Sequence, residues 1–268
     1  MATGLLNTGV RTEADAALAL LGDYVDNKSV PLKTSAIMGL GLAYAGSQRE
    51  DLLSLLLPHV ADENMSMEVV SLSALALGFV FIGSANGDVN STISQTLMER
   101  VERDPKSLDE KWGRFMALGL ALLYLGRLFI SVLTGTRVQR YRKIGLQESD
   151  DKDATIEFLK AIEHPISKTA RILVDVCSYA GSGNVLKVQA MLRHCDEHID
   201  ISKEKEKEKE TEGAKEGDAQ EERKDDTFQA FAVIGIALVA MGEDVGAEMS
   251  LRQFNHLVSS CISSIQQD

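Results

Sequence analysis

The chain has 268 residues, 44% of them hydrophobic and only 5% aromatic, and its formal net charge is -12. This composition favours closely packed helices over a β-sheet, because sheets need many β-branched and aromatic residues. The acidic balance argues against nucleic acid and anionic membranes as partners, since no basic surface is available to neutralise phosphates. Three cysteines, Cys177, Cys195 and Cys261, show no paired spacing and fit free thiols in a reducing compartment.

The first 25 residues predict a partial repeat. Residues 4–7 are expected to end a helix, because Gly9 follows where other helices of the chain stop. Glu13–Val25 is expected to be the outer helix of this unit. Met1 is not followed by a basic and apolar leader, so no signal peptide is expected, and the chain looks cut at its beginning.

Residues 35–60 predict a helical hairpin that the rest of the chain repeats. Small residues in its first half allow another helix to approach closely, and Gly46 is expected in the left-handed conformation that ends a helix. Ser47 is expected to cap the second helix, and Pro58 is expected to end it. The leucines between them supply the apolar stripe of that helix.

Glycines that follow apolar runs recur along the chain at spacings of 37, 37, 43, 55 and 61 residues. Periods of about 20 to 50 residues are typical of stacked repeats. We therefore expect an all-α fold, an α-solenoid of about six helical hairpins over residues 1–258, with the first one partial. The glycines of this ladder are Gly9, Gly46, Gly83, Gly126, Gly181 and Gly242.

The later hairpins follow in chain order. The third is expected to contain helices at Val69–Ile82 and Asn90–Glu102, and Lys111–Gly126 opens the fourth. Residues 166–195 predict the fifth hairpin and residues 228–257 the sixth. The apolar period is then lost, so residues 259–268 are expected to form an irregular tail that leaves the last hairpin uncovered.

Two inserts explain the long spacings. Arg127–Gly145 carries five basic residues and no acid, and its removal restores a spacing of 36 residues. We therefore hypothesise that it is a retained intron or a gene-model artefact, with a loop insertion as the alternative. Residues 200–226 are densely charged and contain no aromatic residue, so a disordered charged loop is expected, either a solvated spacer or a docking tail for a basic partner.

Signals of other functions are weak. Residues 115–134 contain a single charge and have the length of a membrane span, but a glycine of the ladder divides them, which favours buried repeat helices. His194 and His198 share a helix face, yet no further ligand is spaced to complete a metal shell. Residues 83–88 lack the lysine of a phosphate-binding loop. No catalytic motif, metal or cofactor is expected.

Several consecutive hairpins resemble the proteasome/cyclosome-repeat scaffold subunits of the 26S proteasome regulatory particle. The resemblance covers nearly the whole chain outside the two inserts and the tail. The stretches that carry it are NTGVRTEADAALALLGDYV, GLAYAGSQREDLLSLLLPHVADENMSMEV, GSANGDVNSTISQTLMERVE, KAIEHPISKTARILVDVCSYAGSGNVLKVQAMLRHC and ALVAMGEDVGAEMSLRQFNHL.

The resemblance implies a non-catalytic scaffold whose repeats form an arc of a toroid of two helix rings. It implies contacts with the proteasomal ATPase ring and other regulatory-particle subunits, and docking of ubiquitin, ubiquitin-like domains of shuttle factors and a deubiquitinase. It also implies a cytoplasmic and nuclear location. A helical-repeat adaptor unrelated to the proteasome is the alternative, and co-purification with the ATPase ring would separate the two.

The family's receptor surface corresponds to outer helices of this region. Its acidic contact positions correspond to Asp88, Gln95 and Glu99 in the motif GDVNSTISQTLME, and Gln95 departs from the acid that some members have. These three residues are spaced by seven and four, which places them on one helix face that suits a basic, apolar-centred ubiquitin fold. Glu50 and Asp51, in the first turn of the preceding outer helix, are further candidates. An ordinary solvated acidic face is the alternative.

Overall fold

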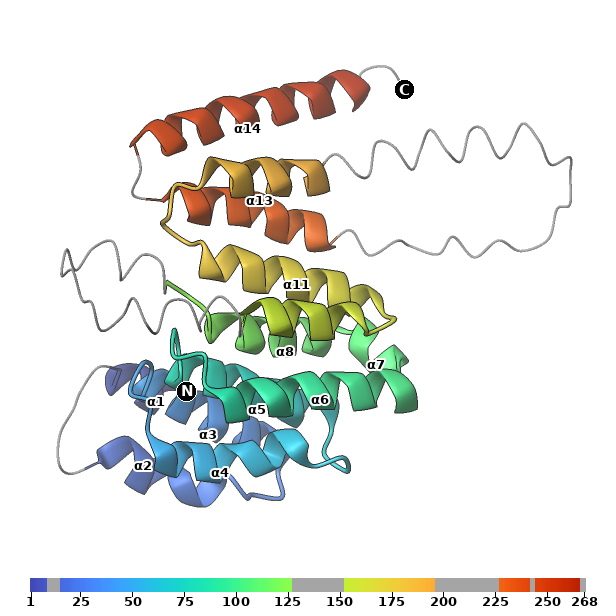
Figure 1. Cartoon of the computed structure of the whole chain (residues 1–268). Helices are drawn as coiled ribbons and strands as arrows, with labels where there is room; N and C mark the ends of the chain where they lie inside the picture. Colours follow the sequence, from blue (N-terminus) through green and yellow to red (C-terminus); the bar gives the residue numbers. More distant parts are fainter. Residues whose placement is uncertain (9–14, 127–151, 196–226, 242–243, 266–268) are drawn as a thin grey trace, which may run out of the picture. The chain divides into compact units, whose positions relative to one another are not determined.

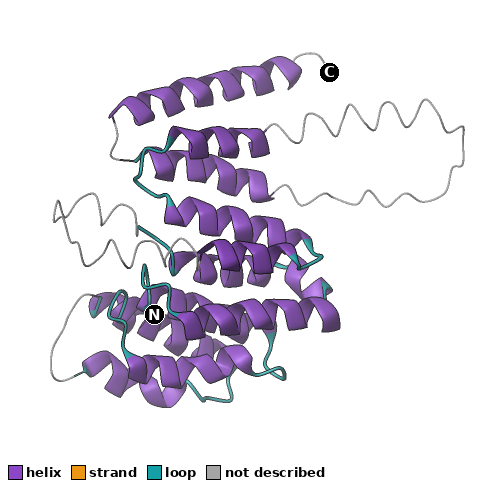
Figure 2. Cartoon of the chain, viewed as in Figure 1, coloured by secondary structure: helices purple, strands orange, loops and turns teal. Residues whose placement is uncertain are grey.

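The computed structural model describes residues 1–8, 15–126, 152–195, 227–241 and 244–265. Helices and loops account for these residues, and none of them forms a strand (Figure 2). The all-α class is therefore confirmed over this part of the chain. The chain divides into two compact units, Met1–Ser178 and Tyr179–Asp268.

The first unit is built from helical hairpins (Figure 1). The first helices of successive hairpins, α1, α3, α5, α8 and α11, contact one another in chain order, while α4 lies against α5 and α6. This order is the one expected of an α-solenoid. The bounds are α1 Ala2–Leu6, α2 Ala16–Leu21, the 3-10 helix η1 Gly22–Tyr24, α3 Val30–Ala43, α4 Glu50–Ala61, α5 Met67–Val80, α6 Gly87–Arg103, α7 Lys106–Asp109, α8 Lys111–Leu122, a helix at 152–160 and α11 Pro165–Ser178.

Small residues bring the first helices of neighbouring hairpins into backbone contact. A Cβ atom added at Gly41 would lie 2.7 Å from the Cα atom of Ala76. A Cβ atom added at Gly78 would lie 2.5 Å from the carbonyl oxygen of Gly119. The expectation that small residues of the hairpin 35–60 admit a neighbouring helix is confirmed at Gly41, and Gly78 makes the same kind of contact. The core between the helices is aliphatic, and its largest fully buried side chains include Ile37, Leu40, Leu52, Leu56, Leu77, Ile93, Leu97, Met116 and Leu120.

A left-handed turn joins the two helices of each of these hairpins. Gly46 and Gly83 have φ values of 71° and 68°, as expected from the ladder. Their N–H groups, however, donate to carbonyl oxygens of the following hairpin, Gly46 to Phe79 at 2.9 Å and Gly83 to Leu122 at 3.0 Å. The turn therefore satisfies donors of one hairpin with the free carbonyls at the helix end of its neighbour.

The expected bounds of α4 are wrong at both ends. Ser47 lies in the turn and does not cap α4, which begins at Glu50 after Arg49. Pro58 lies inside α4, which continues to Ala61. The proline removes one backbone hydrogen bond, and burial of His59 and Val60 offsets that loss. Sequence reasoning assigned the cap and the stop from residue type alone, without the tertiary contacts that override them.

The second unit shows the same turn. The N–H of Gly181, whose φ is 70°, donates to the carbonyl oxygen of Leu238 at 2.8 Å. The N–H of Gly183 donates to that of Val239 at 2.8 Å. The helices of this unit are a helix at 185–195, α13 Thr227–Ala240 and α14 Asp244–Ile265.

The C-terminal segment differs from its expectation. Residues 259–265 were assigned to an irregular tail, but they continue α14 as helix. The absence of an apolar period does not prevent a helix here, since serine, cysteine and isoleucine keep moderate helix propensity. Gly9, Gly242, the insert 127–145 and the charged loop 200–226 lie outside the described residues.

None of the helices described is both long and apolar enough to cross a membrane. Of the segment 115–134, the structure describes residues 115–126, which belong to α8 and its C-terminal turn.

Candidate protein-docking surface

Helix α6 is positioned by a cap at its start and by burial of one face. The side-chain oxygen of Asn86 accepts a hydrogen bond from the Val89 N–H at 3.0 Å, which satisfies a free donor of the first turn. Val89, Ile93 and Leu97 are fully buried on the face that contacts the neighbouring helices. The opposite face therefore faces solvent and can meet a partner.

Three of the predicted site residues lie on this outer side of α6. Asp88 and Gln95 are exposed, and Glu99 is half-buried. The side-chain amide of Gln95 donates to a carboxylate oxygen of Glu99 at 3.1 Å. The structure thus joins Gln95 and Glu99 directly, and Asp88 lies in the first turn of the same helix.

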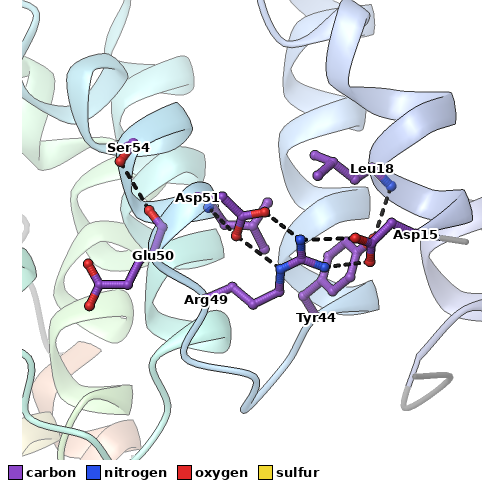
Figure 3. A network of polar contacts seen from close by, with 8 residues as sticks. Asp15, Leu18, Tyr44, Arg49, Glu50, Asp51 and Ser54 are labelled. Carbon is purple, nitrogen blue, oxygen red and sulfur yellow. Dashed lines mark hydrogen bonds and ion pairs between the residues drawn. The ribbon is translucent and has the colours of Figure 1, made fainter. Parts of the chain in front are cut away.

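The two candidates on α4 differ in their surroundings (Figure 3). Glu50 is exposed, and its side chain points away from the network around Arg49. Asp51 forms an ion pair with Arg49, which also pairs with Asp15 at the start of α2. The hydrogen bond from Arg49 holds the pKa of Asp51 below its usual value. The charge of Asp51 is therefore already partnered within the chain.

Arg49 joins three helices. Its guanidinium group also lies 4.9 Å from the centre of the Tyr44 ring, and the Tyr44 hydroxyl accepts a hydrogen bond from the Leu18 N–H at 3.1 Å. The hydrogen bond that Arg49 donates lowers the pKa of Asp15 as well, and the bonds that Arg49 donates to Asp51 and Asp15 raise its own pKa. Sequence reasoning missed this network, since Asp15 and Arg49 are 34 residues apart and no local pattern relates them.

The basic residues near the end of α6 are occupied by the loop between α4 and α5. Arg100 donates to the carbonyl oxygen of Met65 at 2.9 Å, and Arg103 forms an ion pair with Glu63. These contacts leave acidic and polar groups to dominate the outer face of α6. A hollow adjoins that face, lined by Ala61, Glu63, Thr96, Glu99, Arg100 and Arg103.

The described residues contain no cluster of three or more His, Cys, Asp and Glu side chains that could hold a metal ion. His194 is within the described part of the chain, whereas His198, its expected partner on the same helix face, is not.

Comparison with known proteins identifies the class of fold. Residues 35–69, which include most of α3 and all of α4, match the sequence profile of the Proteasome/cyclosome repeat. Together with the hairpins stacked in chain order, this match defines an α-helical repeat chain of the proteasome/cyclosome type.

The chain is homologous to regulatory subunits of the 26S proteasome. It is 46% identical over 255 residues to 26S proteasome regulatory subunit rpn1 of Schizosaccharomyces pombe, covering 95% of this chain and 24% of that protein. It is 41% identical over 260 residues to 26S proteasome regulatory subunit rpn-1 of Neurospora crassa, covering 96% of this chain and 24% of that protein. It is 39% identical over 258 residues to 26S proteasome non-ATPase regulatory subunit 2 of Dictyostelium discoideum, covering 96% of this chain and 23% of that protein.

These matches confirm the resemblance that the hairpin sequences indicate. The chain spans about a quarter of the length of the curated relatives it matches, between 23% and 24% of each. What those whole proteins assemble with therefore enters only as a proposal for this chain.

Proposed function

We propose that this chain is a non-catalytic scaffold and receptor element of the 26S proteasome regulatory particle. The observation that carries the proposal is the homology to proteasome regulatory subunits over 95% of the chain. The fold supports a scaffold role, because backbone hydrogen bonds at Gly46 and Gly83 tie each hairpin to the next and hold the outer helices in register.

The outer face of α6 is the proposed site for ubiquitin and the ubiquitin-like domains of shuttle factors. Asp88 and Gln95 are exposed there, and Glu99 is held beside Gln95 by a hydrogen bond of 3.1 Å. Acidic groups on a rigid helix attract a basic, apolar-centred surface and orient it on encounter. Glu50 on α4 is a second acidic contact, while Asp51 contributes less because Arg49 already pairs with it.

The remaining proposed partners rest on the resemblance of the repeats to the family. We propose the proteasomal ATPase ring, other regulatory-particle subunits and a deubiquitinase, in a cytoplasmic and nuclear setting. Co-purification of the tagged 268-residue chain with the ATPase ring supports this assignment. Reproducible absence of the ring, with the chain folded, favours a helical-repeat adaptor outside the proteasome.

The receptor site is tested by reversing charge on α6. We expect the double variant D88R/E99R to bind ubiquitin and a ubiquitin-like domain at least about tenfold more weakly in a titration, because like charges then face the partner. E163R, which reverses an exposed acid in the loop before α11, is the matched control. Equal affinity of the double variant and the control, with unchanged helicity by circular dichroism, would remove this site.

A further inference from the structure

The turn between α5 and α6 ends in an asparagine–glycine pair. Asn86, the residue before α6, is followed by Gly87, and it is the one asparagine of the chain that a glycine follows. Asparagine is among the thermolabile residues of proteins, because the backbone nitrogen of the next residue can attack its side-chain amide carbon. A glycine at that next position leaves the attacking nitrogen unshielded, since it has no side chain.

The fold gives no packing reason for a glycine at position 87. A Cβ atom added at Gly87 would meet no described atom within 4 Å, and its φ lies outside the left-handed region. The residue is exposed at the first position of α6, where a helix leaves the N–H groups without an intrahelical acceptor. The Gly87 nitrogen is therefore accessible to solvent and is not held by the helix.

An equivalent turn in the second unit provides an internal comparison. Asn184, like Asn86, lies three residues after the turn glycine, and its side-chain oxygen accepts a hydrogen bond from the Leu186 N–H at 3.0 Å. A serine two residues earlier accepts from the backbone N–H in both turns, at 3.2 Å for Asn86 and 3.4 Å for Asn184. The residue after Asn184 is Val185, so a helix begins after the same cap without a glycine.

We propose that Asn86 is a site of spontaneous deamidation in the folded chain. The Gly87 nitrogen loses its proton to solvent and bonds to Asn86 Cγ, the side-chain nitrogen leaves as ammonia, and a five-membered succinimide ring results. Water then opens the ring. Cleavage at Cγ yields aspartate, whereas cleavage at the backbone carbonyl carbon yields isoaspartate, in which the main chain runs through Cγ. The reaction uses no partner, so the proposal is independent of the receptor function.

The capping hydrogen bond controls how often the ring can close. Asn86 has a ψ of 122°, at which the Gly87 nitrogen is not eclipsed with Cβ as a flat ring requires. Closure therefore needs rotation about the Cα–C bond, which draws Asn86 Oδ1 away from the Val89 N–H. Such local opening at a helix end costs much less free energy than global unfolding, so it occurs while the chain stays folded.

The two products have opposite effects on the first turn of α6. Aspartate keeps the capping oxygen and adds a negative charge at the N-terminus of the helix, which is favourable. Isoaspartate lengthens the main chain and removes the cap from Val89. We expect hydrogen exchange of the Val89 N–H to become faster in the isoaspartate form and to stay slow in N86D.

The test follows both asparagines of the full chain in one sample. We expect Asn86 to convert at least about tenfold faster than Asn184 at about pH 8, because the β-branched Val185 shields the attacking nitrogen. Digestion with pepsin at acidic pH stops the reaction, and mass spectrometry reads both sites. N86D supplies the aspartate peptide, from which the isoaspartate peptide separates on elution.

Two reciprocal variants provide the matched controls. G87A should slow conversion of Asn86 at least about tenfold, and V185G should accelerate that of Asn184. Faster conversion at Asn86 that is lost in G87A supports the proposal. Equal rates at the two asparagines, or an unchanged rate in G87A, overturn it. Conversion of Asn86 only in denaturant also overturns it, because the reaction then belongs to the unfolded chain.

Discussion

The N–H of Gly83 donates a hydrogen bond to the carbonyl oxygen of Leu122, 3.0 Å away, across the junction between two hairpins. Two residues later Ala85, also at positive φ, donates to the carbonyl oxygen of Leu123 at 2.9 Å. Because carbonyls at the end of a helix have no partner within it, these bonds both satisfy them and fix the register of the hairpins.

Among the turn glycines Gly46, Gly83 and Gly126, replacement of Gly83 by alanine is expected to be the most costly change. Its φ is 68°, which costs a side chain about 1 kcal/mol or more, and the new Cβ atom would lie 2.9 Å from the carbonyl oxygen of Leu125. We expect the free energy of unfolding to fall by about 2 to 3 kcal/mol, measured by denaturant titration.

G46A provides the comparison for G83A. Gly46 has nearly the same φ, 71°, but its Cβ atom would meet only Ile82 Cγ2 at an ordinary 3.5 Å. We expect a loss of about 1 kcal/mol from the backbone conformation alone. Equal losses for the two variants would show that contact with the next hairpin adds nothing.

The contact between α5 and α8 gives a second prediction. A Cβ atom at Gly119 would lie 2.5 Å from the carbonyl oxygen of Ala74, and neither backbone can move independently of its helix. We expect G119A to lower the free energy of unfolding by about 3 kcal/mol through forced separation of the helices. The control is G87A at the start of α6, where no described atom lies within 4 Å and a change of under about 0.5 kcal/mol is expected.

The repeat architecture could be predicted because its signals are local. An apolar run, a left-handed glycine and a second amphipathic run recur within each period, and Gly46, Gly83, Gly126 and Gly181 all have positive φ. The exact helix ends could not be predicted in the same way. Ser47 is a good cap by residue type, but it lies in a turn that is hydrogen-bonded to the next hairpin. Propensity describes a segment alone, whereas that turn is stabilised from outside it.

The candidate site was predictable in part. The spacing of Asp88, Gln95 and Glu99 places them on one side of α6, as the structure shows. The spacing could not show that Arg49 forms an ion pair with Asp51. It also could not show that the Met98 side chain is exposed while the adjacent Glu99 is half-buried. Burial and ion pairing depend on the neighbouring helices, which a helical wheel does not include.

The Arg49 network is expected to stabilise the chain in a pH-dependent way. The lowered pKa values of Asp15 and Asp51 mean that their contribution is present above their unfolded value, near 3.8, and is lost as pH falls through the lower folded values. R49M should therefore unfold at a lower denaturant midpoint than the unaltered chain at pH 7, with a smaller difference near pH 3.

The control for R49M is K28M, which removes an exposed cation elsewhere in the first unit. Its midpoint should stay close to that of the unaltered chain at both pH values, because exposed charges contribute little. A constant difference between R49M and the unaltered chain from pH 7 to pH 3 would contradict a role for the two carboxylates.

His59 gives the last prediction, in a different pH window. Its side chain is buried, with Nε2 3.4 Å from Asp26 Oδ1, and burial followed by the nearby Lys33 charge lowers its pKa from 6.5. The unfolded chain therefore binds this proton more readily than the folded one, so stability falls as pH decreases below about 6.5. H59Q should flatten the stability profile between pH 7 and pH 5, measured by denaturant titration.

K33M tests the cause of that shift, because it removes the cation that opposes protonation while keeping a long side chain. The pKa of His59 should then move back toward 6.5, and the loss of stability on acidification should become smaller than in the unaltered chain. NMR titration of the His59 ring reads the pKa directly. A steeper loss of stability in K33M, or a ring that titrates above 6.5 in the unaltered chain, would contradict the assignment.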